Sequence, residues 1–248
     1  MKKEFLLLLA STIFFIECTN SIGAHNSSSV QKGIVKGRVT DSQNKPMTNV
    51  NVVIENTVFH ASYVYAKTNA AGDYSVSMPA GSWKAMVRIN HPYLGKTYQF
   101  DLHPDDPSPF AGTTGAIRNF TWKLSGEKPD GTGFYGSDVA VYSQPGSSFS
   151  MEDVEITLTP DGTLADGSNG TSITKTLTDI GGGEDGIRDI PIGKYIITAR
   201  NKTNSKSLQV RLRNKGEYQA SVTGIFSSGY TGITNYQIPV QVQDKDDL

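Results

Sequence analysis

The stretch 91–106 holds the residue types best suited to metal chemistry, His91, Tyr93, Tyr98, His103 and Asp105. Imidazole, phenolate and carboxylate groups are common ligands of transition metals. The two histidines stand twelve residues apart, and neither is followed at the third or fourth position by the glutamate that completes the usual zinc motif. We therefore predict no metal site, no cofactor and no catalytic residue, with His91, His103 and Asp105 as the alternative ligands.

Aromatic rings in the same region suggest a second kind of chemistry, the stacking of sugars. Phe120 and Trp122 alternate with polar neighbours, as buried strand residues do. Tyr93, Tyr98 and Phe110 lie among prolines and glycines, which predicts loop and therefore exposure. These three are the predicted ligand-binding residues.

Other functions lack the residues that they need. The chain has no Gly-x-Ser-x-Gly turn for a nucleophilic serine, and its glycine run 181–183 lacks the lysine of a phosphate-binding loop. The formal charge is −1, with 23 basic and 24 acidic residues scattered along the sequence. Such a chain has no positive field to attract phosphates, so we exclude nucleic acid as a partner.

The N-terminus has the pattern of an export signal. Lys2 and Lys3 precede an apolar run, residues 5–16, that is too short to span a bilayer. Cys18 follows in a setting that resembles the lipobox of bacterial lipoproteins, with Glu17 in place of the usual small residue. Two routes stay open, acylation of Cys18 after removal of residues 1–17 or cleavage after Ala24. We predict an exported protein, secreted, periplasmic or held at the membrane by a lipid on Cys18.

The elements that would position these residues are strands. Apolar residues alternate in Val50–Ile54 and again in Val154–Leu158, and no run outside the N-terminus keeps a helical period. Each stretch is followed by a proline–glycine turn that leads into an aromatic residue, Trp83 in the first half and Tyr195 in the second. The repeat predicts an all-β protein of two similar antiparallel domains after a signal helix.

Turn-forming and proline-rich stretches divide the chain. The interval 91–115 contains four prolines, so we expect it to be mostly loop. The predicted units are the signal (1–24, or 1–17 for a lipoprotein), a linker (25–33), a first β-sandwich (34–124), a linker (125–133), a second β-sandwich (134–243) and a tail (244–248).

The opening Gly37-Arg38-Val39-Thr40-Asp41, the turn at Gly72-Asp73-Tyr74 and the Pro79-Ala80-Gly81-Ser82-Trp83 motif resemble the carboxypeptidase regulatory-like family. This family has a fold similar to transthyretin, an immunoglobulin-like sandwich. The resemblance covers residues 34–91, and residues 185–196 repeat its later half. It implies an accessory module without catalytic activity of its own.

These observations predict an exported, non-catalytic binding or structural module of the cell envelope, whose partner is a polysaccharide or an envelope protein. Two alternatives remain. The first is a metal-dependent enzyme that uses the loop from His91 to Asp106, and the second is an adhesion or fibre subunit assembled through open sheet edges.

Overall fold

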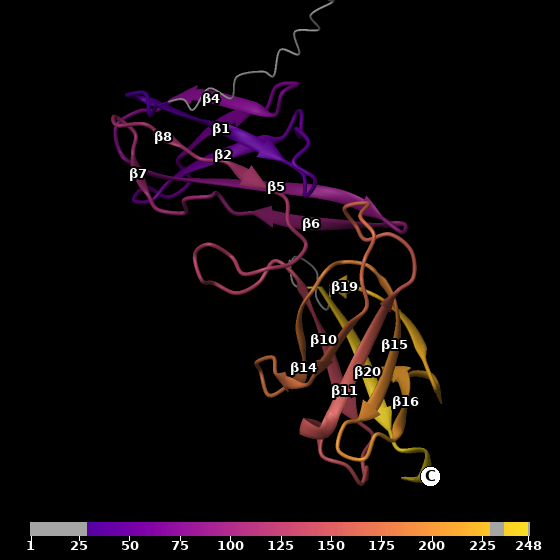
Figure 1. The fold of residues 1–248 in the computed structure, drawn as a ribbon. Helices are drawn as coiled ribbons and strands as arrows, with labels where there is room; N and C mark the ends of the chain where they lie inside the picture. The colour runs from indigo at the N-terminus through magenta and orange to yellow at the C-terminus, as the bar shows by residue number, and fades with distance from the viewer. Residues whose placement is uncertain (1–28, 229–235, 248) are drawn as a thin grey trace, which may run out of the picture.

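The computed structural model describes residues 29–228 and 236–247. Strands dominate, and the helical elements of the described chain are two short 3-10 turns, η1 (Met151–Asp153) and η2 (Lys245–Asp247). Two β-domains lie end to end, the first in indigo to magenta and the second in orange to yellow (Figure 1). The prediction of an all-β protein is confirmed.

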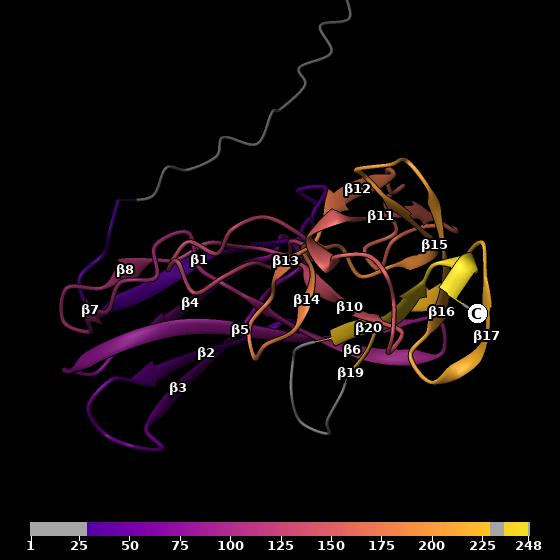
Figure 2. The same ribbon diagram turned by 90° about the horizontal axis from the view of Figure 1, so that it is seen from below.

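The first domain is a sandwich of two sheets, which Figure 2 shows as separate layers. Buried apolar residues alternate with exposed ones along its strands, so each sheet turns one face to the core. One layer contains β4 (Asp73–Ser77), β1 (Ile34–Thr40), β8 (Ala116–Ile117) and β9 (Phe120–Thr121). The other runs in the order β3 (Tyr63–Lys67), β2 (Asn51–Asn56), β5 (Ser82–Tyr93) and β6 (Lys96–Leu102), with β7 (Phe110–Ala111) also on β5.

The second domain has the strands expected from its sequence pattern, in the order β12-β11-β15-β16-β20-β10-β14-β13, with β17, β18 and β19 attached to this path. The stretch 218–222 is divided between β17 and β18. The strands are β10 (Ser137–Ser143), β11 (Val154–Pro160), β12 (Ile173–Thr176), β13 (Thr178–Asp179), β14 (Asp185–Ile190), β15 (Lys194–Asn201), β16 (Ser207–Leu212), β17 (Lys215–Gln219), β18 (Val222–Ile225), β19 (Ser227–Ser228) and β20 (Tyr236–Gln243).

The two domains share their strand connections. In the first, β1 pairs antiparallel with β4, and β2 lies between β3 and β5. In the second, β10 pairs with β14 in the same way, and β11 lies between β12 and β15. Each first strand also has parallel neighbours, β8 and β9 for β1 and β20 for β10. These parallel pairs were not predicted, because alternation in a sequence does not reveal strand direction.

The proline–glycine turn that marks the repeat brings its aromatic ring close to its glycine in both halves, although only Gly81 has a positive φ, 135°. A Cβ on Gly81 would come within 3.1 Å of Trp83 Nε1, and one on Gly193 within 3.0 Å of Tyr195 Cε2. The aromatic ring therefore lies directly over the glycine in each domain, where a larger residue would displace it. Both rings are buried, as the motif predicts.

The interval 91–115 is about half strand, because β5 continues to Tyr93 and turns at Leu94 and Gly95 into β6, while most of the rest is loop as expected. Gly112 N donates to Gly81 O, which shows that the odd-numbered residues of β5 direct their backbone groups towards β6 and β7. Pro92 is even-numbered, so the N–H that it lacks would have pointed to the other edge of β5, the edge that faces β2. The pairing of β5 with β2 has already ended there, at Val87, so the proline costs no bond of the sheet.

The predicted signal, Cys18 and residues 25–28 of the first linker lie outside the described residues. Within the part of the chain that the structure covers, no helix is long and apolar enough to cross a membrane.

Candidate ligand-binding site

Tyr98, predicted to bind a ligand from an exposed loop, lies instead between the two domains. Its side chain is 1% exposed, and its hydroxyl donates to Phe226 O of the second domain at 2.7 Å. Its ring meets the ring of Tyr236 edge on, with centroids 4.9 Å apart. Burial raises the pKa of Tyr98 to about 12, so the hydroxyl keeps its proton and remains a donor. The expectation that this ring is exposed is wrong.

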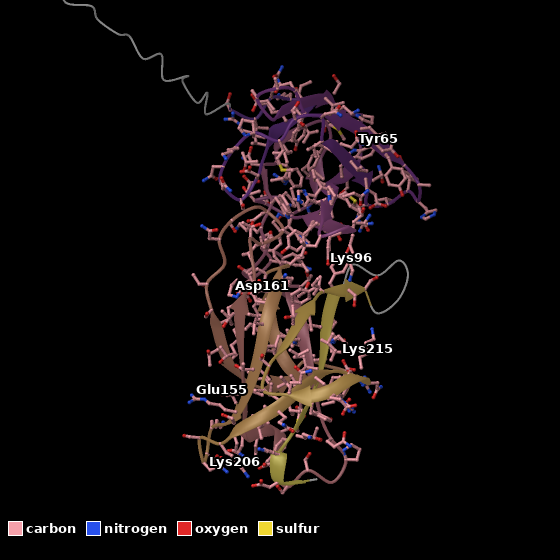
Figure 3. The ribbon with its side chains drawn as sticks, turned by 90° about the vertical axis from the view of Figure 1, so that its right-hand side faces the viewer. Tyr65, Lys96, Glu155, Asp161, Lys206 and Lys215 are labelled. Carbon is pink, nitrogen blue, oxygen red and sulfur yellow. The ribbon has the colours of Figure 1, made fainter. Side chains whose placement is uncertain are left out.

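Tyr93 is half-buried and contributes to the same contact. Its hydroxyl donates to Thr163 O at 2.6 Å and accepts from Lys194 N at 3.2 Å. Lys96, which Figure 3 places between the domains, donates from Nζ to Phe226 O at 3.3 Å. The β5–β6 hairpin is thus held against the second domain by direct hydrogen bonds.

Phe110 lies in the core of the first domain, not on its surface. It is 8% exposed, stands opposite Trp83 where β7 pairs with β5, and has the guanidinium of Arg118 5.3 Å from its ring centre. The three predicted rings are therefore not gathered on one open face.

The alternative metal ligands do not form a cluster. His91 packs on Trp122 with ring centres 4.8 Å apart, and His103 packs on Tyr135 at 5.6 Å. Asp105 accepts from Asn119 N at 3.0 Å and from Asn119 Nδ2 at 2.8 Å, which ties the loop after β6 to the segment before β9. In the described chain no three of its His, Cys, Asp and Glu side chains are grouped to hold a metal ion.

A different feature of the first domain has the character of a binding site, a gap along one edge of β5. On this edge β6 pairs with β5 from Val87 onward, and β7 pairs with Ser82 and Trp83. Between them Lys84, Ala85 and Met86 pair with β2 on the other edge but with no strand of the described residues on this one. We call this opening the β5 gap.

The strand geometry assigns the free backbone groups of the β5 gap to Ala85. Thr57 N of the segment after β2 donates to Ser82 O, so the even-numbered residues of β5 face β2. Ala85 faces the other way, and its N–H and C=O point into the gap. A sheet edge with a single open donor and acceptor can accept one residue of an added strand.

A pocket of about 410 Å³ occupies the β5 gap. Half of its lining residues are apolar and half are polar or charged, a mixture that offers both packing and hydrogen bonds to a ligand. Arg88 and Asp101 neutralise each other across β5 and β6, with Arg88 Nη2 3.1 Å from Asp101 Oδ2. The lining residues are Lys84, Ala85, Met86, Val87, Arg88, Asp101, Leu102, His103, Pro104, Pro107, Ser108 and Asp130.

His103 supplies an unsatisfied polar atom at this pocket. Its Nε2 is buried and forms no hydrogen bond within the described structure. Burial lowers the pKa of His103 against the opposing pull of Asp130, so the ring is neutral at physiological pH. A buried polar atom without a partner is rare in native proteins, and an unfilled binding position is one reason for it.

The pocket has binding groups without an activated nucleophile. Ser108 lines it beside His103, but its hydroxyl bonds to Asp106 and not to the imidazole. The arrangement offers a donor and an acceptor from Ala85, beside the neutral ring of His103. Sequence reasoning considered His103 but missed Ala85 and Met86, because the gap depends on where β6 ends and β7 begins.

A model of the carboxypeptidase regulatory-like domain matches residues 34–110, from β1 to the start of β7. No curated protein matches the chain.

Solved structures resemble the chain only distantly. The TIE protein of Bacillus anthracis is 11% identical with a TM-score of 0.35, over 86% of this chain and 34% of that one, so the chain spans about a third of its length. A DUF3823 family protein of Bacteroides ovatus is 12% identical with a TM-score of 0.27, over 77% and 98%. A streptococcal ancillary pilin is 10% identical with a TM-score of 0.25, over 85% and 63%.

Proposed function

We propose that the chain, whose residues 34–110 match a model of the carboxypeptidase regulatory-like domain, is an exported, non-catalytic binding module of the cell envelope. Its ligand is an extended segment of an envelope protein, bound in the β5 gap. The proposal rests on one observation, the open N–H and C=O of Ala85 at the edge of a pocket that His103 also lines.

The chemistry of the gap favours a peptide over a polysaccharide. A peptide residue presents an acceptor and a donor on one side of its backbone, the complement of the pair at Ala85. Its side chains would meet Met86 and the prolines of the loop after β6. No phenylalanine, tyrosine or tryptophan ring lines the pocket for a sugar to stack on. The rings predicted for that role, Tyr93, Tyr98 and Phe110, are occupied in the domain contact and the core.

The contact between the domains gives this module a fixed form. Tyr98 and Tyr93 bind carbonyl groups of the second domain, and Gln99 N donates to Tyr236 Oη at 2.6 Å. The segment between the domains is fastened as well, since Gly126 N and Gly136 N both donate to Asp189 Oδ1. The second domain therefore holds the β6 side of the pocket in place.

The test is selection of binders from a random-sequence peptide library displayed on phage, in parallel with a glycan array. We expect peptides that bind the exported chain and lose at least tenfold in affinity to Met86→Trp, which fills the pocket from an exposed position. His103→Phe should weaken the same peptides, because it removes the ring nitrogen and keeps the ring.

Phe59→Ala is the matched control, since this side chain is 69% exposed on the β2–β3 turn and outside the pocket. It should bind the selected peptides like the unchanged protein. Peptide binding that is insensitive to Met86→Trp, or binding of glycans alone, would contradict the proposal.

A further inference from the structure

The outer edge of β3 carries unpaired backbone groups whose identity can be derived. Asn56 N donates to Ser62 O, and Thr68 N donates to Val50 O. The residues Ser62, Val64, Ala66 and Thr68 therefore face β2. Tyr63, Tyr65 and Lys67 face the other way, and no strand of the described chain pairs with them there.

The same three residues place their side chains on the outer, solvent-facing surface of the sheet. Tyr63 is 40% exposed and Tyr65 is 64% exposed, with their ring centres 6.0 Å apart, and Lys67 is exposed too. Figure 3 shows Tyr65 on the outside of the first domain. Native edge strands are usually protected by proline, bulges or inward charges. β3 has regular pairing to β2 and no proline.

The equivalent strand of the second domain differs. β12 occupies the place of β3 in the repeated topology, and its sequence is Ile173-Thr174-Lys175-Thr176. It presents no aromatic ring, and Lys175 Nζ donates to Arg188 O at 2.7 Å across to β14. The exposed aromatic edge is therefore particular to the first domain and not a consequence of the fold.

We propose that β3 is a docking strand for a second copy of this chain, paired antiparallel and centred on Tyr65. In this register Tyr65 stands opposite Tyr65 of the second copy, and Tyr63 stands opposite Lys67 at both ends. Each of these pairs exchanges two N–H···O bonds, so every outward-facing group of the strand is satisfied.

The side chains favour the same register. The two Tyr65 rings become cross-strand neighbours, and Lys67 of the second copy lies beside Tyr63. Glu55 of β2 stands next to Tyr63 on the same face, so the arriving ammonium group meets an aromatic ring and a carboxylate. The edge is therefore complementary to itself in charge, which a polysaccharide or an unrelated strand would not match.

The symmetry limits the assembly to a pair. An antiparallel contact of one strand with its own copy has a two-fold axis and uses each edge once, so it closes and does not propagate into a fibre. β3 lies at the opposite edge of the sheet from β6, which borders the β5 gap. The inference thus stands or falls independently of the peptide-binding proposal.

Sedimentation velocity of the exported chain over a range of concentrations tests the pairing. We expect a monomer that becomes a dimer as the concentration rises. Tyr65→Pro should remain monomeric throughout, because it removes an N–H that bonds to nothing within the sheet. Phe59→Ala, another exposed aromatic change on the same hairpin, should still dimerise. An unchanged protein that stays monomeric, or a Tyr65→Pro variant that still dimerises, overturns the inference.

Cross-linking provides a test that does not depend on folding of the proline variant. Directly opposed strand residues lie at a Cα separation that a disulfide can span. In a chain carrying Cys18→Ala, Tyr65→Cys should form a covalent dimer on oxidation. Tyr63→Cys alone should not, whereas a mixture of Tyr63→Cys and Lys67→Cys chains should. Failure of Tyr65→Cys to cross-link, or equal cross-linking by Tyr63→Cys alone, would show that the strands do not pair in this way.

Discussion

Trp83 and Tyr195 occupy matching positions in the two domains, and each donates a hydrogen bond to the proline carbonyl four residues earlier. Trp83 Nε1 lies 3.2 Å from Pro79 O, and Tyr195 Oη lies 2.9 Å from Pro191 O. Different aromatic residues thus close the same turn with the same bond. The two halves thus share a hydrogen bond from an aromatic side chain to the proline carbonyl, although the aromatic residue differs.

The hydrogen bond from Tyr195 to Pro191 O should contribute to stability, and removing the tyrosine hydroxyl tests this. Tyr195→Phe keeps the ring and leaves Pro191 O without this donor, so we expect a loss of about 1 kcal/mol in the free energy of unfolding. Urea denaturation measures it. Tyr65→Phe is the control, because that exposed side chain has no hydrogen bond within the described residues and should change stability little. Equal losses in both variants would argue against the role of the bond.

Tyr98 predicts coupled unfolding of the two domains. We expect the unchanged protein to unfold in one calorimetric transition, because its domains are joined by Tyr98, Tyr93 and Tyr236. Tyr98→Ala removes both the hydroxyl bond and the ring contact, and should separate the unfolding into two transitions. A single transition in Tyr98→Ala would mean that the domains are coupled by something else.

The first domain leaves no room for a side chain at position 37, where the residue is Gly37. A Cβ at this position would lie 1.8 Å from Arg118 O, a backbone atom of the short segment between β8 and β9, both of which pair with β1. Gly37→Ala should therefore destabilise the protein by about 3 kcal/mol, measured by urea denaturation.

Gly95→Ala is the matched comparison for Gly37. Gly95 has φ of 75° at the hairpin tip and open space around it, so only the backbone conformation resists a side chain there. We expect a cost of about 1 kcal/mol. A smaller effect at Gly37 than at Gly95 would be inconsistent with the close approach.

His103 predicts a pH dependence of stability. Burial holds its pKa in the folded protein below the ordinary value of 6.5. Between that lowered pKa and 6.5 the unfolded chain binds more protons, so the folded state loses stability as the pH falls through this window. Above 6.5 the imidazole is neutral in both states and contributes no such dependence.

The measurement compares unfolding free energies of the unchanged protein and His103→Phe from pH 8 to pH 5. The difference should shift in favour of the variant at acidic pH, because phenylalanine takes up no proton. Contributions from other titrating groups cancel in the difference. A difference that stays constant over the whole range would show that His103 titrates alike in the folded and unfolded chains.

Sequence alone determined the strands and their repetition. Val50–Ile54 and Val154–Leu158 alternate because one side of each strand faces a core, and that period is written in local residue order. The proline–glycine–aromatic turns could be recognised for the same reason, since they depend on neighbouring residues. Exposure in the stretch 91–110 could not be predicted, because Pro92 is compatible with a strand wherever its missing N–H has no partner.

Tertiary structure decided which residues are available to bind. Tyr98 is buried by Phe226, 128 positions away along the chain, and Ala85 is open because β6 and β7 stop on either side of it. The outer edge of β3 is unpaired because no strand of the described residues other than β2 pairs with it. Contacts between distant segments are fixed by how whole sheets pack, and no local pattern of residues records where a neighbouring strand ends.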